Sequence, residues 1–138
     1  MTRLPLVVLL AVVALGAAAC SDDASEDAAG TGQGNGASTA SQPAVDAVSD
    51  IAPRLESAVR SETYPMSLQE AVARIDELGL TPTAPLQVAG YRYDADLVEF
   101  TLCVEDADSG AYATYNTAPM SVRQAGDSGG CAAADLTR

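Results

Sequence analysis

The chain has 138 residues, room for one domain, and carries 7 basic against 19 acidic residues for a net charge of −12. Such an acidic chain is repelled by nucleic acid and by anionic lipid surfaces, so nucleic-acid binding is excluded. Histidine and lysine are both absent, which removes the bases that most often activate a serine or cysteine nucleophile.

Residues 1–19 have the order of an export signal. Arg3 precedes an apolar run of 16 residues from Leu4 to Ala19, which ends in small residues directly before Cys20. A transmembrane helix needs about 20 apolar residues, so this run is short for a membrane span. We therefore predict a signal peptide over residues 1–19.

The stretch LGAAAC resembles the lipobox of bacterial lipoproteins, in which the cysteine becomes the lipid-modified first residue of the mature chain. The resemblance implies that Cys20 carries lipid such as palmitate and anchors the protein to the outer face of the cytoplasmic membrane. Ala17 stands where the family prefers leucine. Cleavage after Ala19, which would leave a secreted protein, is therefore kept as the alternative.

Residues 20–43 are expected to form a tether. The stretch SDDASEDAAGTGQGNGASTASQ, residues 21–42, contains no large apolar side chain and cannot bury enough surface to offset the entropy of ordering. We predict a flexible acidic linker rich in Gly, Ser and Ala. Its four carboxylates are interpreted as a solvated charge run rather than a metal site, because no fold fixes their positions: Asp22, Asp23, Glu26 and Asp27.

The folded domain is predicted over residues 44–138 and begins with helical periodicity. Apolar residues recur three and four positions apart, as on the buried face of a helix: Val45, Val48, Ile51, Leu55 and Val59. Pro53 interrupts this pattern. Two alternatives follow, a kink at Pro53 or a short lead-in and a new helix that starts there, with Asp50 near its cap.

A second helix has clear start and stop signals. Ser67 is the predicted N-cap, Glu70 completes a capping box, and Gly79 closes the helix. Four apolar residues form its buried stripe: Leu68, Val72, Ile75 and Leu78.

After residue 85 the apolar residues alternate, as they do in strands. The stretches LQVAGYRY and LVEFTLCVE flank a turn of residues 94–96 and predict a β-hairpin. On the second strand one face carries Val98, Phe100, Leu102 and Val104, and the other carries Glu99, Thr101, Cys103 and Glu105.

The stretch AYATYN predicts a third strand with Tyr112 in the core, and residues 120–124 suit a fourth short strand. Helices followed by antiparallel strands indicate an α+β fold, in which N-terminal helices pack on a small antiparallel sheet of three to four strands.

The stretch GDSGGC, residues 126–131, is similar to the segment around the nucleophilic serine of trypsin-like proteases. Ser128 has no histidine anywhere in the chain to take its proton. Two glycines and an Asp-Ser pair instead favour a turn directly before Cys131. We expect no protease activity, and nothing in the sequence implies a cofactor.

Three cysteines are an awkward number for an exported protein. If Cys20 carries lipid, Cys103 and Cys131 remain, and an exported compartment favours their oxidation to a disulfide. Such a bond closes a loop of about 28 residues and contributes roughly 3.5 kcal/mol. Zinc binding is the alternative, but two cysteines without histidine make a poor zinc site.

Residues 64–131 resemble the C-terminal globular region of type IV pilin-like proteins from Gram-positive bacteria. That family shows Tyr-Pro before a short helix, a hairpin with a Tyr-rich first strand, a cysteine in the next strand and a final Ser-Gly-Gly-Cys. The matching positions are Tyr64, Pro65, Tyr91, Tyr93, Phe100, Cys103, Tyr112, Tyr115, Gly129, Gly130 and Cys131. The resemblance implies a pilin-like head, a disulfide between Cys103 and Cys131, and a terminal turn at GDSGG.

Pilins polymerise through a long N-terminal apolar helix that carries a glutamate, whereas this chain has a lipoprotein-like signal and a polar tether. We therefore expect no filament subunit. We expect a non-catalytic, lipid-anchored cell-envelope protein whose head contacts an envelope or surface protein or supports surface assembly.

Two other classes remain as alternatives: a small extracellular module that binds a glycan, a peptide or calcium, and an enzyme. Their candidate carboxylates form two groups, Asp94, Asp96 and Glu99, and Glu105, Asp106 and Asp108. Hairpin turns attract Asp for backbone reasons alone, so neither group is predicted to be a metal or catalytic site.

Overall fold

The computed structural model describes residues 37–60 and 62–136; the predicted signal peptide, Cys20 and the four acidic residues of the predicted tether lie outside them. The domain contains two helices followed by a four-stranded antiparallel sheet, so the α+β prediction is confirmed. The elements are α1 Gln42–Val59, α2 Leu68–Glu77, β1 Leu86–Asp94, β2 Glu99–Asp106, β3 Tyr112–Asn116 and β4 Ser121–Gly126. No helix in this part of the chain is long and apolar enough to cross a membrane.

α1 is a single helix that runs through Pro53. Its buried face continues on both sides of the proline, where Ile51, Ala52 and Leu55 are each at most 2% exposed. The alternative of a new helix starting at Pro53 is therefore wrong. Tertiary burial of one continuous apolar face outweighs the backbone hydrogen bond that proline removes.

α2 begins and ends where the sequence predicts. The Glu70 N–H donates to Ser67 Oγ over 3.2 Å, which satisfies one of the free N–H groups at the start of the helix. The capping box is wrong in one bond, because Glu70 Oε2 accepts from the Met66 N–H over 2.8 Å and not from that of Ser67. At the other end the N–H of Leu80 donates to the carbonyl oxygen of Ile75 over 2.9 Å, and the N–H of Gly79 donates to that of Asp76 over 3.0 Å. These two bonds form a Schellman motif, which closes the helix. The predicted buried stripe is wrong at Leu68, which is 37% exposed.

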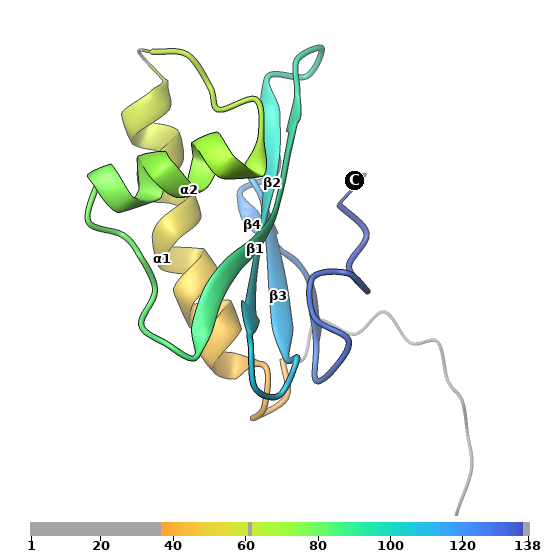
Figure 1. Ribbon diagram of the computed structural model, residues 1–138. Helices are drawn as coiled ribbons and strands as arrows, with labels where there is room; N and C mark the ends of the chain where they lie inside the picture. The colour runs from red at the N-terminus through yellow and green to blue at the C-terminus, as the bar shows by residue number, and fades with distance from the viewer. Residues whose placement is uncertain (1–36, 61, 137–138) are drawn as a thin grey trace, which may run out of the picture. The chain divides into compact units, whose positions relative to one another are not determined.

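The sheet has the order β1-β2-β3-β4, with antiparallel neighbours joined by tight connections. Both helices lie on one side of it, and the C-terminal segment lies on the other side (Figure 1). The helix-facing core combines α1 with alternate strand residues, chiefly Phe100, Leu102, Val104, Ala113 and Tyr115. The fourth strand at residues 121–126 confirms the larger of the two predicted strand numbers.

Aromatic side chains join β1 to the segment between the helices. The rings of Tyr64 and Tyr93 stack with centroids 5.1 Å apart, and those of Tyr91 and Phe100 are 5.4 Å apart. The Tyr91 hydroxyl donates to the carbonyl oxygen of Pro65 over 2.9 Å. The core therefore extends from α1 to the start of α2.

Val98 does not share the core face of β2 with Phe100, so that part of the strand prediction is wrong. It lies in the β1–β2 turn, 58% exposed, with a φ of 54°. The turn is longer than predicted because Asp94 Oδ1 accepts hydrogen bonds from the N–H groups of Asp96 and Leu97, at 3.0 and 3.1 Å. This bonding holds residues 95–98 outside both strands.

Candidate functional site

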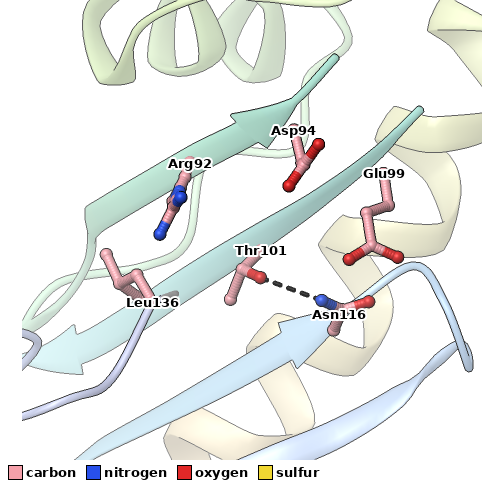
Figure 2. A pocket seen from close by; sticks show the side chains of 6 residues that line it. All are labelled: Arg92, Asp94, Glu99, Thr101, Asn116 and Leu136. Carbon is pink, nitrogen blue, oxygen red and sulfur yellow. Dashed lines mark hydrogen bonds between the residues drawn. The ribbon is translucent and has the colours of Figure 1, made fainter. Parts of the chain in front are cut away.

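The face of the sheet away from the helices carries a small polar pocket near the β1–β2 turn (Figure 2). It is lined by Arg92, Asp94, Glu99, Thr101, Asn116 and Leu136. The pocket is partly open, and its space of about 10 Å³ is at the lower limit for one water molecule. It is too small for a substrate or an organic ligand.

Asn116 is the buried polar centre of this pocket, and the sequence did not single it out. Its Nδ2 donates to Thr101 Oγ1 over 3.0 Å, and its Oδ1 accepts from the N–H of Ala118 over 2.6 Å. Both side chains in the first bond are buried. Through these two hydrogen bonds Asn116 joins β3 to β2 and fixes the turn that follows β3.

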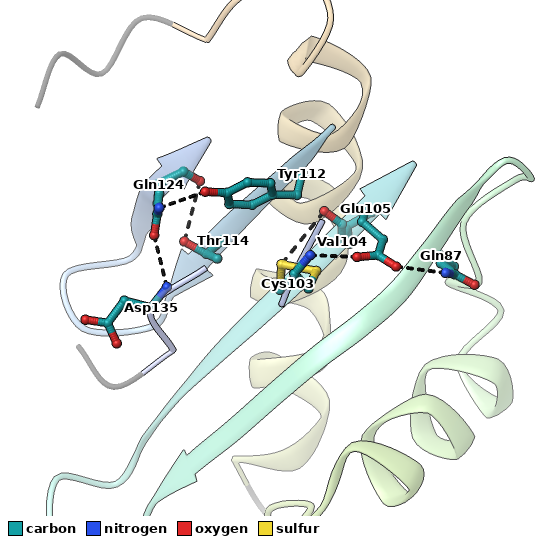
Figure 3. Close-up of a disulfide and its surroundings, with 9 residues drawn as sticks. Gln87, Cys103, Val104, Glu105, Tyr112, Thr114, Gln124 and Asp135 are labelled. Carbon is teal, nitrogen blue, oxygen red and sulfur yellow. Dashed lines mark hydrogen bonds between the residues drawn. A yellow bond between two sulfur atoms is a disulfide. The ribbon is translucent and has the colours of Figure 1, made fainter. Parts of the chain in front are cut away.

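The other half of this face is covered by the C-terminal segment, which a disulfide joins to β2 (Figure 3). The sulfur atoms of Cys103 and Cys131 are bonded, and their Cα atoms are 5.9 Å apart. The two residues are 0% and 5% exposed. The predicted disulfide is confirmed, and it leaves neither cysteine available to a metal.

Gly90 makes room for the disulfide. It pairs with Cys103 across β1 and β2. A Cβ at this position would lie 2.9 Å from the Cβ of Cys103 and 3.0 Å from Cδ1 of Leu136. The absence of a side chain on Gly90 is what lets the C-terminal segment lie against the sheet.

Glu105 fixes the same segment through its carboxylate. Oε2 accepts from the N–H of Cys131 over 2.6 Å, and Oε1 accepts from Nε2 of Gln87 over 2.9 Å (Figure 3). On the neighbouring strands, Gln124 Nε2 donates to the Tyr112 hydroxyl over 2.7 Å. Glu105, a candidate catalytic or calcium-binding carboxylate in the sequence, thus holds the disulfide loop.

Asp106 caps its own turn. Its Oδ1 accepts from the N–H groups of Ser109 and Asp108, at 2.8 and 2.9 Å. The Ser109 N–H in particular holds the pKa of the Asp106 carboxyl below its usual value. The carbonyl oxygen of Gly110, at the end of this turn, accepts from the Gly130 N–H over 2.8 Å, which docks the GDSGG segment.

The GDSGG segment forms the turn expected before Cys131. Gly129 and Gly130 have φ values of 89° and 60°, a region that side chains disfavour. Ser128 is exposed on this turn, and Asp127 accepts a hydrogen bond from the Ser38 hydroxyl ahead of α1. The Asp beside the serine therefore contacts the start of the domain.

The acidic groups do not converge. Asp94 caps the β1–β2 turn, Glu105 binds the C-terminal segment, and Asp106 caps the β2–β3 turn. Within residues 37–60 and 62–136, no group of three or more His, Cys, Asp or Glu side chains is placed to hold a metal ion.

A larger open groove of about 340 Å³ lies between α1 and the segment that leads into β1. Ile51, Leu80 and Pro82 supply apolar walls. At its rim Arg54 pairs with Asp50 over 3.0 Å, and both side chains are more than half exposed. Such an exposed pair contributes little to stability or binding.

Comparison with protein-family models, with curated proteins and with solved structures finds no match to this chain.

Proposed function

We propose that this protein is a lipid-anchored, non-catalytic component of the cell envelope that presents a small pilin-like domain for contact with another protein. The observation that carries the proposal is the Cys103–Cys131 disulfide. A buried disulfide of this kind forms and persists in an exported compartment.

The pairing also accounts for the third cysteine. Of the three cysteines in the chain, two are bonded to each other, which leaves Cys20 at the end of the apolar run. Its position directly after LGAAA suits acylation. One lipid-bearing cysteine and one disulfide together would leave no free thiol, which suits an exported protein.

The arrangement of the domain suits presentation to a partner. The described chain starts beside α1, and Ser38 contacts Asp127 at the end of the sheet where β4 finishes. The β1–β2 and β3–β4 turns lie at the opposite end (Figure 1). Both turns therefore lie at the end of the sheet away from the point where the described chain begins.

The roles of the acidic residues favour contact over catalysis. The carboxylates of Asp94, Glu105 and Asp106 are engaged by backbone N–H groups of turns or of the C-terminal segment. Ser128 stands on an exposed turn in a chain without histidine. The chain has neither histidine nor lysine, so its serine and threonine hydroxyls lack the base that acyl transfer usually uses.

The pilin-like assignment is supported by three features that the resemblance implies. Helices pack on one face of an antiparallel sheet, the two matching cysteines are bonded, and GDSGG is a turn before the last cysteine. The predicted polar tether stands where a pilin has its polymerising helix. Contact with a different envelope protein is therefore proposed instead of filament growth.

Lipid attachment is tested by expressing the full chain in a Gram-positive host with an alkyne-labelled fatty acid. We expect label on the wild type, recovery in the membrane fraction, and loss of both in Cys20→Ala. The variant Ser21→Ala serves as the matched control and should retain the label. An unlabelled wild-type protein in the culture medium would contradict the anchor.

A further inference from the structure

Two turns at one end of the sheet expose large apolar side chains. Leu97 and Val98 in the β1–β2 turn are 57% and 58% exposed, and Met120 in the β3–β4 turn is 53% exposed. β2 begins directly after the β1–β2 turn, and β3 ends directly before the β3–β4 turn. These two strand ends are adjacent because Thr101 pairs with Asn116. We call Leu97, Val98 and Met120 the apolar tip.

Two of the three residues hold a backbone conformation that their side chains disfavour. Val98 has a φ of 54° and Met120 a φ of 62°, in the left-handed region that Gly and Asn occupy most readily. A β-branched residue such as valine is especially rare there. Both side chains remain more than half exposed, so the domain gains no core packing from them.

Strained residues of this kind gather at binding sites, where the strain is offset by an interaction. Asp94 holds the β1–β2 turn from within the domain, but 58% of Val98 and 53% of Met120 stays exposed, so the core supplies little packing to offset the strain. A partner that buries these side chains supplies that packing. Both strained positions lie at the same end of the sheet, which indicates one contact surface.

The charge near the apolar tip favours a partner with a basic surface. Residues 94–99 contain three acidic residues, Asp94, Asp96 and Glu99, and the nearby basic residue is Arg92, which lines the same pocket as Asp94 and Glu99. Residues 37–136 carry 5 arginines against 15 acidic residues, a net charge of 5 − 15 = −10. A second copy of the domain and an anionic membrane surface are both repelled by this charge, whereas a basic protein surface is attracted.

We propose that the apolar tip docks into an envelope protein that offers an apolar pocket bordered by lysine or arginine. Leu97 and Val98 enter the pocket as anchors, and Asp96 and Glu99 meet the basic border. This inference deepens the contact role proposed above and rests on it.

The proposal predicts that stability and docking respond differently to one substitution. Asn tolerates the left-handed region, so Val98→Asn should keep or raise the melting temperature of the purified protein. The same substitution removes an apolar anchor and should weaken docking by about tenfold or more. Met120→Asn should behave likewise, while Met66→Asn, at an exposed residue ahead of α2, should leave docking unchanged.

Docking is measured with a photoreactive amino acid placed at Leu97 in the full-length protein, in the cells that produce it. A second version carries the photoreactive group at exposed Ala107 in the β2–β3 turn, at the other end of the sheet. Adducts are digested and the joined segments are sequenced by mass spectrometry. We expect position 97 to join one envelope protein at a segment with large apolar and basic residues, with the yield reduced in Val98→Asn.

Other outcomes overturn the inference in distinguishable ways. Adducts from position 107 alone contradict the apolar tip and leave the contact role intact. Adducts of position 97 with lipid or with a second copy contradict the proposed partner, as does a yield that Val98→Asn does not change. The absence of protein adducts from both positions contradicts the contact role itself.

Discussion

At the scale of single residues, the absence of a side chain at Gly90 is as important for the packing of the C-terminal segment as the two disulfide cysteines. Gly90 lies where a Cβ would come within 2.9 Å of Cys103 Cβ and 3.0 Å of Leu136 Cδ1. These are closer than carbon atoms approach without displacement, and both neighbours belong to the packed disulfide face. The close packing of the C-terminal segment therefore depends on glycine at this position.

Gly90→Ala is expected to lower the free energy of unfolding by about 1–3 kcal/mol, because the new methyl group overpacks the disulfide face. Urea unfolding monitored by circular dichroism measures the loss. In a Leu136→Ala background one of the two contacts is gone, so the same substitution should be less destabilising. An equal loss in both backgrounds would assign the effect to something other than this contact.

Tyr91 gives stability a dependence on alkaline pH. Burial, and then the neighbouring Tyr93, raise the pKa of Tyr91 above its usual value of 10.0. As the pH rises above about 10, the unfolded chain loses this phenolic proton before the folded protein does, so folding stability falls. Below that pH both states keep the proton and the contribution is fully present.

Urea midpoints measured between about pH 8 and pH 11 should therefore stay level and then decline. Tyr91→Phe removes the titrating group and should flatten the decline, while it lowers stability at neutral pH by loss of the bond to Pro65. Burial also raises the pKa of Tyr115, so part of the decline in stability should remain in the Tyr91→Phe variant. An identical pH profile in both proteins would exclude Tyr91 as its source.

At the scale of elements, the disulfide joins the C-terminal segment to β2 across 28 positions of sequence. Removing it in the double variant Cys103→Ala, Cys131→Ala should lower the free energy of unfolding by about 3.5 kcal/mol, mainly because the unfolded chain gains freedom. Chemical denaturation measures this, and the reduced wild type should resemble the variant. An unchanged denaturation midpoint would show that the bond does not stabilise the domain.

The elements also show what the sequence could predict. Both ends of α2 were predictable because a cap is a local contact, as between Ser67 and Glu70. The core side of β2 from Phe100 onward followed from alternation. The position of Val98 did not follow from alternation. Hydrogen bonds to the Asp94 side chain determine where the turn ends, and the alternation of apolar residues contains no information about them.

Contacts between distant parts of the chain could not be predicted either, because local sequence patterns contain no information about them. The close approach of Leu136 to Gly90 and the bond from Cys131 to Glu105 depend on how the C-terminal segment folds back. Nothing in the residues near Glu105 distinguishes a structural anchor from a catalytic carboxylate. The disulfide was predictable because the number of cysteines and the predicted export signal limited the choices.

At the scale of the whole molecule, we assign no catalytic chemistry to Ser128. Ser128→Ala should leave folding, export and partner contact unchanged, because the residue stands exposed on a turn and the chain has no histidine to activate it. A fluorophosphonate probe applied to the exported protein provides the measurement. Labelling that disappears in Ser128→Ala would establish a reactive serine and contradict a non-catalytic role.

The central claim is that an exported chain uses one cysteine for lipid and two for a disulfide. Intact mass spectrometry of the mature protein, purified from membranes without reductant, tests both parts at once. We expect a chain that begins at Cys20, carries a covalent lipid there, and lacks the two hydrogens of the Cys103 and Cys131 thiols. A mass that corresponds to an unmodified chain with free thiols at all three cysteines would contradict it.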